Sequence, residues 1–152
     1  GYGGAKLTDL VYYIRRIADP HQCGAIVLFI DNDITGDSTD RSPEEILTLF
    51  RQTIRQVRKD HPKTPVFWIE VTPTPLRWNY WEEISEANRQ ISEFCSKTRN
   101  LDFIPTSQKF IGSDGKPVVD YFQKDNLHLN PTGYKLWSEC IKSELEKRLP
   151  HL

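Results

Sequence analysis

The chain alternates between two hydrophobic patterns, one typical of helices and one typical of buried strands. Four segments carry apolar residues at helical spacing: 6–17, 42–59, 78–97 and 131–149. Three segments are short, mostly apolar runs: 25–30, 66–71 and 101–104. Such runs are typical of strands that a parallel sheet buries on both faces. We therefore predict one α/β domain over residues 1–152, a three-layer α/β/α sandwich with a mainly parallel sheet.

Polar loops follow these predicted strands and precede the last helix. They comprise residues 31–41, residues 72–77 and residues 125–128. In open α/β sheets, binding and catalytic sites gather at the carboxyl ends of the strands. We expect the three loops to meet at one edge of the sheet, although they are far apart in the sequence.

Composition excludes several function classes. The 152 residues carry a net charge of −1, so the basic surface that a nucleic-acid partner or an anionic membrane requires is not expected. No apolar run approaches the roughly 20 residues of a membrane span. The three cysteines are far apart and form no Cys-x-x-Cys, which argues against a zinc ribbon or a redox motif. Cys95 and Cys140 lie in helical patterns, and we expect both to be buried thiols.

The strongest chemical signal is Asp125-x-x-His128, in a short loop before the last helix. Imidazole, with an ordinary pKa near ~6.5, is the usual general acid or base at neutral pH. It works best when a carboxylate fixes its tautomer and stabilises the imidazolium. We therefore predict that Asp125 holds one ring nitrogen of His128 and leaves the other for a substrate or nucleophile. The alternative is a surface histidine beside a helix-capping segment.

The loop after the first strand admits several interpretations. Asp31 and Asp33 resemble the first motif of haloacid-dehalogenase-like phosphatases, which implies Mg²⁺ and an aspartate nucleophile. A calcium loop is disfavoured because Ser42 stands where a bidentate Glu is needed. The Gly-Asp-Ser sequence that ends at Ser38 matches a serine-nucleophile signature. In lipases and esterases that triplet directly follows the first strand, whereas here residues 31–35 lie between them. Asn32 is a candidate oxyanion donor, or else bonds its own loop backbone.

Taken together, three motifs resemble the SGNH hydrolases, also called GDSL-type esterases. Residues 1–5 (GYGGA) are similar to the second block of that family, residues 30–34 (IDNDI) to the third, and residues 125–134 (DNLHLNPTGY) to the fourth. The stretch 72–75 with Arg77 and Trp78, and Asn88 in the next helix, are similar to one bacterial branch. The resemblance covers nearly the whole chain and implies a flavodoxin-like fold.

The resemblance also implies a site and a reaction. His128 would be the general acid and base, Asp125 would orient it, and the Asn32 side chain with the Gly3 backbone N–H would form the oxyanion hole. The reaction would be ester hydrolysis through an acyl-enzyme, without metal or organic cofactor. The substrate would be a small ester, such as an acetyl ester of a carbohydrate. Arg77 and Trp78 would lie in the cleft that binds it.

Two departures from the family pattern qualify this expectation. The third block normally opens with glycine, where this chain has Ile30, and a β-branched residue does not easily take a positive φ. The first block, which carries the nucleophilic serine, is not found before residues 1–5. We therefore expect an upstream segment or a separate chain to supply the first strand and its serine. The alternative from another class is a non-catalytic binding module with the same fold.

Overall fold

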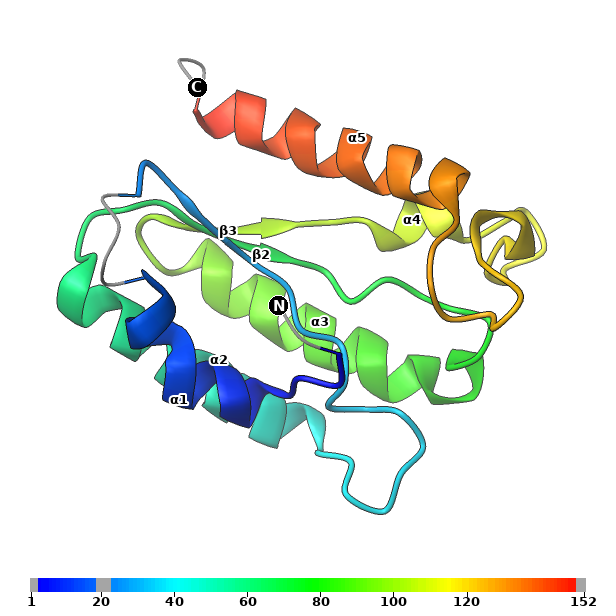
Figure 1. The fold of residues 1–152 in the computed structure, drawn as a ribbon, viewed down its shortest axis with the longest axis horizontal. Coiled ribbons are helices and arrows are strands. Elements are labelled where there is room, and N and C mark those ends of the chain that lie inside the picture. Colours follow the sequence, from blue (N-terminus) through cyan, green and yellow to red (C-terminus); the bar gives the residue numbers. More distant parts are fainter. Residues whose placement is uncertain (1–2, 19–22, 150–152) are drawn as a thin grey trace.

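The computed structural model describes residues 3–18 and 23–149 of the 152 residues. The described elements follow in the order α1 (Leu7–Ala18), β1 (Ile26–Leu28), α2 (Pro43–Asp60), β2 (Val66–Ile69), the 3₁₀ turn η1 (Trp78–Tyr80), α3 (Trp81–Ser96), β3 (Leu101–Ile104), α4 (Ser107–Phe110), the 3₁₀ turn η2 (Val119–Tyr121) and α5 (Pro131–Arg148). Helices and strands alternate as the hydrophobic pattern predicts (Figure 1).

The described strands form one parallel sheet in the order β1-β2-β3. Ile26 pairs with Val66 in the β1–β2 register, and Val66 pairs with Leu101 in the β2–β3 register. Parallel neighbours require a crossover connection, which α2 and α3 supply. The carboxyl ends of all three strands therefore point the same way, toward the loops predicted to carry the site.

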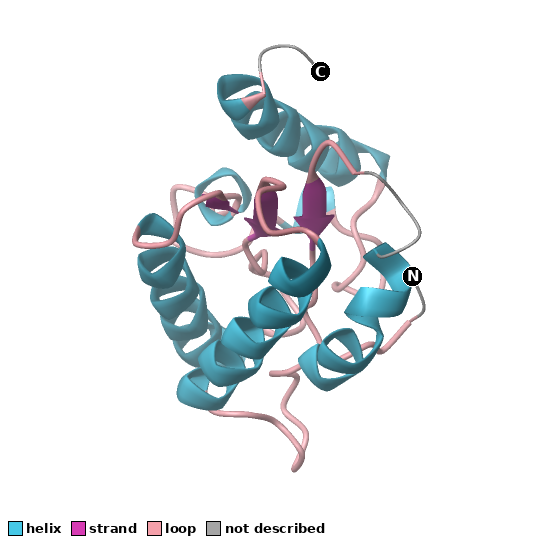
Figure 2. Cartoon of the chain, turned by 90° about the vertical axis from the view of Figure 1, so that its left-hand side faces the viewer, coloured by secondary structure: helices cyan, strands magenta, loops and turns pink. Residues whose placement is uncertain are grey.

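The sheet lies between two helical layers, α1 to α3 on one face and α5 on the other (Figure 2). Between the sheet and the first layer, Phe50 of α2 packs edge to face on Trp68 of β2, and both side chains are among the most buried. On the other face, Phe67, Ile69 and Ile104 form a smaller core against residues of α5. The predicted three-layer sandwich with a parallel sheet is confirmed, and so is the core position of Trp68.

Local capping explains where two of the helices begin. Ser42 and Glu45 form a capping box at the start of α2, in which each side chain accepts a hydrogen bond from the other residue's backbone N–H. At α5, the Asn130 side chain accepts hydrogen bonds from the N–H groups of Thr132 and Gly133. Pro131 then occupies the first helical turn, where a missing N–H costs nothing.

Three expectations need correction in detail. β1 and β2 end earlier than predicted, at Leu28 and Ile69, because the chain turns there into the loops of the site. The segment 105–124, expected as a loop or hairpin, contains α4 and η2. Cys95 is buried, which raises the pKa of its thiol to about 12, but Cys140 is only half-buried.

In the part of the chain that the structure describes, no helix is long and apolar enough to cross a membrane.

Candidate active site

The Asp125–His128 loop is held from both sides by backbone hydrogen bonds. The N–H of Gln123 donates to the carbonyl of His128 at 2.7 Å, and Asn126 takes a positive φ of 59°. Asparagine tolerates that left-handed conformation better than most residues. The N–H of Leu76 donates to the Asn126 carbonyl at 3.0 Å, which ties this loop to the loop after β2.

Asp125 and His128 form the predicted pair. His128 Nδ1 lies 2.7 Å from Asp125 Oδ2. The other carboxylate oxygen accepts hydrogen bonds from the backbone N–H groups of Leu127 and His128, both at 3.0 Å. These N–H groups, first that of Leu127, together with the imidazole lower the pKa of Asp125 to about 2. The carboxylate is therefore ionised over the whole neutral range.

This arrangement defines the free nitrogen of His128. An ionised carboxylate only accepts hydrogen bonds, so Nδ1 carries the proton in the neutral imidazole and Nε2 keeps its lone pair. The His128 side chain is 64% exposed, and Nε2 is the nitrogen that a reacting group can approach. The geometry suits a general base whose tautomer is set by a carboxylate.

Asn32 lies at the carboxyl end of β1 and makes long-range contacts. Its Nδ2 donates to the Ala5 carbonyl at 3.2 Å, and its Oδ1 accepts a hydrogen bond from Arg77 Nη2 at 2.8 Å. Neither partner belongs to its own loop, so these contacts differ from the alternative in which Asn32 bonds local backbone. Ile30 stands where the family has glycine, yet it is not among the described residues with a positive φ. The turn therefore forms without that conformation.

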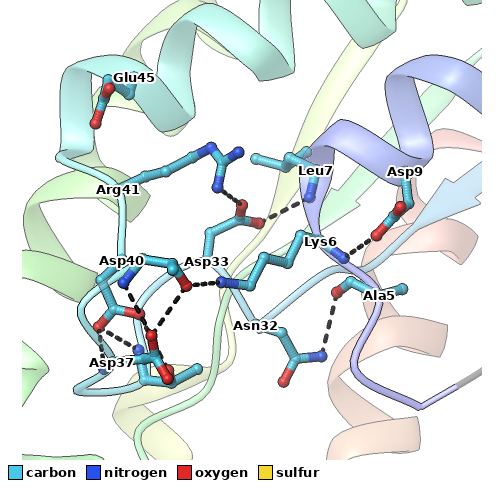
Figure 3. Close-up of polar contacts among 12 residues, drawn as sticks. Ala5, Lys6, Leu7, Asp9, Asn32, Asp33, Asp37, Asp40, Arg41 and Glu45 are labelled. Atoms are coloured by element: carbon cyan, nitrogen blue, oxygen red, sulfur yellow. Dashed lines mark hydrogen bonds and ion pairs between the residues drawn. The ribbon is translucent and has the colours of Figure 1, made fainter.

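Asp33 joins this loop to the start of α1 (Figure 3). Its Oδ2 accepts the N–H of Leu7, the first residue of α1, at 2.9 Å. Arg41 Nη1 lies 3.7 Å from its Oδ1. Burial raises the pKa of Asp33, and the Leu7 N–H opposes that shift. Asp33 thus caps α1 from a distance and, with the Asn32–Ala5 bond, keeps the glycine segment beside Asn32.

A cleft of about 460 Å³ brings four of the predicted residues together. Its lining includes Gly3, Asn32, Arg77 and His128, which come from four separate parts of the sequence. Small-molecule sites typically have volumes of about 300–1,000 Å³. Of the glycine motif, residues 1 and 2 lie outside the described part of the chain.

Two candidate residues lie elsewhere. Ser38 is exposed, its Oγ donates to Asp37 Oδ1 at 3.4 Å, and it is not among the cleft residues. Its loop extends away from α5 (Figure 1). Trp78 is likewise not a lining residue. It stacks on Trp81, with ring centroids 5.9 Å apart and an interplanar angle of 15°.

Asp31 and Asp33, the residues of the phosphatase alternative, each face an arginine. Arg77 Nη1 lies 3.4 Å from Asp31 Oδ2, and Arg41 approaches Asp33 as described above. Among residues 3–18 and 23–149, no group of three or more His, Cys, Asp or Glu side chains is arranged to hold a metal ion.

Sequence reasoning missed part of the cleft wall. Phe29 of the strand end and Trp137 of α5 meet edge to face at 5.4 Å, and Tyr134 packs against Trp137 at 6.4 Å. All three residues line the cleft. The spacing of Tyr134 and Trp137, one helical turn apart directly after the Asp125–His128 loop, is the signal that could have indicated them.

Comparison with known proteins gives a family match. The sequence model of the GDSL-like Lipase/Acylhydrolase family matches residues 1–136. No curated protein sequence matches the chain significantly.

Several solved structures share the fold. A carbohydrate esterase family 3 protein from Talaromyces cellulolyticus superposes with a TM-score of 0.80 at 16% identity, over 100% of this chain and 72% of that one. A GDSL-like lipase from Bacteroides thetaiotaomicron superposes with a TM-score of 0.80 at 18% identity, over 96% of this chain and 73% of that one. A family 3 carbohydrate esterase from Clostridium thermocellum superposes with a TM-score of 0.71 at 18% identity, over 94% of this chain and 66% of that one.

Proposed function

Because this chain belongs to the GDSL-like lipase/acylhydrolase family, whose members hydrolyse esters, we propose that it carries the acid–base pair and the oxyanion hole of a serine esterase. The observation that supports this most directly is the shared cleft, in which His128, Asn32 and Gly3 line one cavity. In this proposal the nucleophilic serine comes from a segment that precedes Gly1 or from a second chain.

The free edge of β1 is a suitable place for that serine. On one side β1 pairs with β2, and the other edge has no strand partner within the described residues. Val27 in β1 and Phe29 directly after it are 41% and 36% exposed, so a strand added at this edge would cover neighbouring apolar side chains. A further parallel strand on this edge would end next to the cleft, as the other strands do.

The residues then act in sequence. His128 Nε2 removes the proton from the serine hydroxyl as the serine attacks the ester carbonyl, and it later delivers that proton to the leaving alcohol. Asp125 holds Nδ1–H and stabilises the imidazolium. The Asn32 amide and the Gly3 backbone N–H donate to the oxyanion of the tetrahedral intermediate. Water repeats the cycle on the acyl-enzyme and releases the acid.

The proposed substrate is a small ester, such as an acetyl ester of a carbohydrate. Two carbohydrate esterases of family 3 share this fold, which supports that choice. Tyr134, 51% exposed, gives the cleft an aromatic wall against which a sugar face can pack.

A non-catalytic binding module is the second candidate function. The observation that favours it is that the cleft residues in the described part of the chain include neither serine nor cysteine. The same cleft without a nucleophile would bind its ligand and leave it intact.

Labelling with a fluorophosphonate probe, followed by mass spectrometry, tests the proposal. The protein would be expressed with its preceding sequence and, in parallel, as residues 1–152. A label on an upstream serine in the longer protein supports the esterase. A label on Ser38 would show that the nucleophile lies within the chain and contradict the proposed arrangement. The absence of any label in the longer protein would favour the binding module.

A further inference from the structure

The contacts of Arg77 point to a role for this residue other than substrate binding. We propose that Arg77 is a positioning residue that fixes the side-chain amide of Asn32, so that an N–H and not the carbonyl oxygen faces the reacting ester. This inference rests on the proposed function, because it concerns the oxyanion donor of that same site.

The hydrogen bonds around Asn32 allow one amide orientation. A guanidinium group only donates, so the Asn32 atom 2.8 Å from Arg77 Nη2 must be the oxygen. The Ala5 carbonyl only accepts, so the atom 3.2 Å from it must be the nitrogen. The two partners select the same orientation from opposite sides. One N–H of Asn32 is then used by Ala5, and its second N–H remains for an oxyanion.

Arg77 itself is held rigidly. It is only 7% exposed, and its Nη1 donates to the Asp31 carbonyl at 2.5 Å. Its backbone N–H donates to Thr74 Oγ1 at 3.2 Å. A guanidinium held by Asp31 and Asn32, in the loop after β1, has little freedom to follow a substrate, which distinguishes positioning from binding.

Without Arg77 the amide loses the contact that fixes its oxygen, and the Ala5 carbonyl alone still favours the orientation. The last torsion of asparagine has a broad, roughly two-fold preference, so the flipped amide becomes accessible. The flipped form presents oxygen lone pairs toward the developing oxyanion, which is repulsive. The defect should therefore appear in turnover rather than in substrate binding.

Arg77 also connects the two halves of the site. The loop that carries it, residues 72–77, contacts the Asp125–His128 loop through the Leu76–Asn126 backbone bond at 3.0 Å. The same loop holds Asn32 through the Arg77 side chain. The distance between the proton-transferring imidazole and the oxyanion donor is thus set by one short segment.

The test is a double-mutant cycle in the complete esterase, with Arg77→Met and Asn32→Ala. We expect Arg77→Met to lower kcat by about 10- to 100-fold with little change in KM, since a single oxyanion donor contributes about 10²–10³-fold. In the Asn32→Ala background, Arg77→Met should cost almost nothing more. A raised KM at unchanged kcat, or two losses that simply multiply, would overturn the inference.

Arg77→Lys serves where Arg77→Met is too unstable to purify. One ammonium group retains a donor for Asn32 Oδ1 but lacks the fork that also reaches Asp31. We expect a loss of kcat smaller than that of Arg77→Met, again absent in the Asn32→Ala background. A loss that persists in that background would contradict positioning through Asn32.

A readout without catalysis separates this inference from the proposed function. The side-chain amide signals of Asn32 can be followed by ¹⁵N NMR in residues 1–152 and assigned by their absence in Asn32→Ala. Arg77→Met should shift these signals, while those of Asn88, whose amide bonds both backbone groups of Val71, stay in place. Unchanged Asn32 signals would refute positioning. A clear shift in residues 1–152, combined with no ester hydrolysis by the longer protein that includes the preceding sequence, would refute the proposed function alone.

Discussion

The two halves of the candidate site are built in opposite ways. The Asp125–His128 pair is local, since its hydrogen bonds span two or three residues, and both side chains are exposed, at 46% and 64%. The oxyanion half is long-range. Asn32 contacts residues 27 and 45 positions away, and its neighbours Asp33 and Arg77 are buried.

This difference indicates which half depends on the rest of the fold. A local pair forms wherever its own loop forms, whereas Asn32 needs the start of α1, the end of β1 and the loop after β2 in place. A distant substitution should therefore disturb the oxyanion donor before it disturbs the imidazole. The predictions below test this contrast, from the largest expected effect to the smallest.

His128→Ala should have the largest effect, a loss of ester hydrolysis on the order of 10⁴-fold or more, because general base and general acid disappear together. Turnover of a chromogenic acetyl ester by the complete protein measures it. His61→Gln is the matched control. The buried His61 ring bonds the Ala18 carbonyl, so that variant should lose thermal stability but keep kcat. Near-normal turnover in His128→Ala would remove His128 from the mechanism.

Asn32→Ala should lower kcat by about 10²–10³-fold, the usual cost of one oxyanion donor. Steady-state kinetics should show little change in KM. Asn79, exposed in η1, provides the control, and Asn79→Ala should leave both constants as they are. An Asn32→Ala enzyme with full kcat would show that the oxyanion is held by other groups.

Gly4→Ala should have a moderate effect. Gly4 has a φ of 75°, and a Cβ there meets no atom within 4 Å, so the cost comes from the backbone alone. An L-residue in this conformation costs roughly 1–2 kcal/mol, and we expect about a tenfold lower kcat as the glycine segment turns away. Gly115→Ala is the matched control, because Gly115 also has a φ of 75° and open space but is not among the cleft residues. Equal losses of kcat in the two variants would argue against a local effect on the glycine segment.

The titration of Asp125 tests the local half. Its pKa is lowered from 3.8 to about 2, so the hydrogen bonds to its carboxylate are fully present above about pH 4 and are lost as the pH falls through about 2. Carboxyl ¹³C NMR on the folded protein should give a midpoint near 2. A midpoint near 4 would mean that the loop does not hold the carboxylate as the structure shows.

Chelation should have no effect. The proposed chemistry uses only side chains and backbone N–H groups, so EDTA followed by added Mg²⁺ should leave ester hydrolysis unchanged. Phosphatase activity on an aryl phosphate that needs Mg²⁺, abolished by Asp31→Asn, would instead support the phosphatase alternative.

Much of the fold could be predicted from the sequence because its signals are local. Apolar spacing at 6–17 and 42–59 indicated α1 and α2, and the runs at 25–30 and 66–71 indicated two parallel strands. Strand ends could not be predicted, since β1 and β2 stop where the loops diverge toward the cleft. The two short helical elements in 105–124 could not be predicted either, because elements of three or four residues show no periodicity.

The sequence by itself determined the Asp125–His128 pair and the cap that follows it. All the groups involved lie in one contiguous stretch, so spacing alone brought carboxylate, imidazole and helix start together. Only the tertiary structure placed Ser38 and Trp78 outside the cleft, and only it assigned Arg77 to Asn32. The direction of a side-chain amide depends on which donors and acceptors meet it, and here those partners come from 27 and 45 residues away.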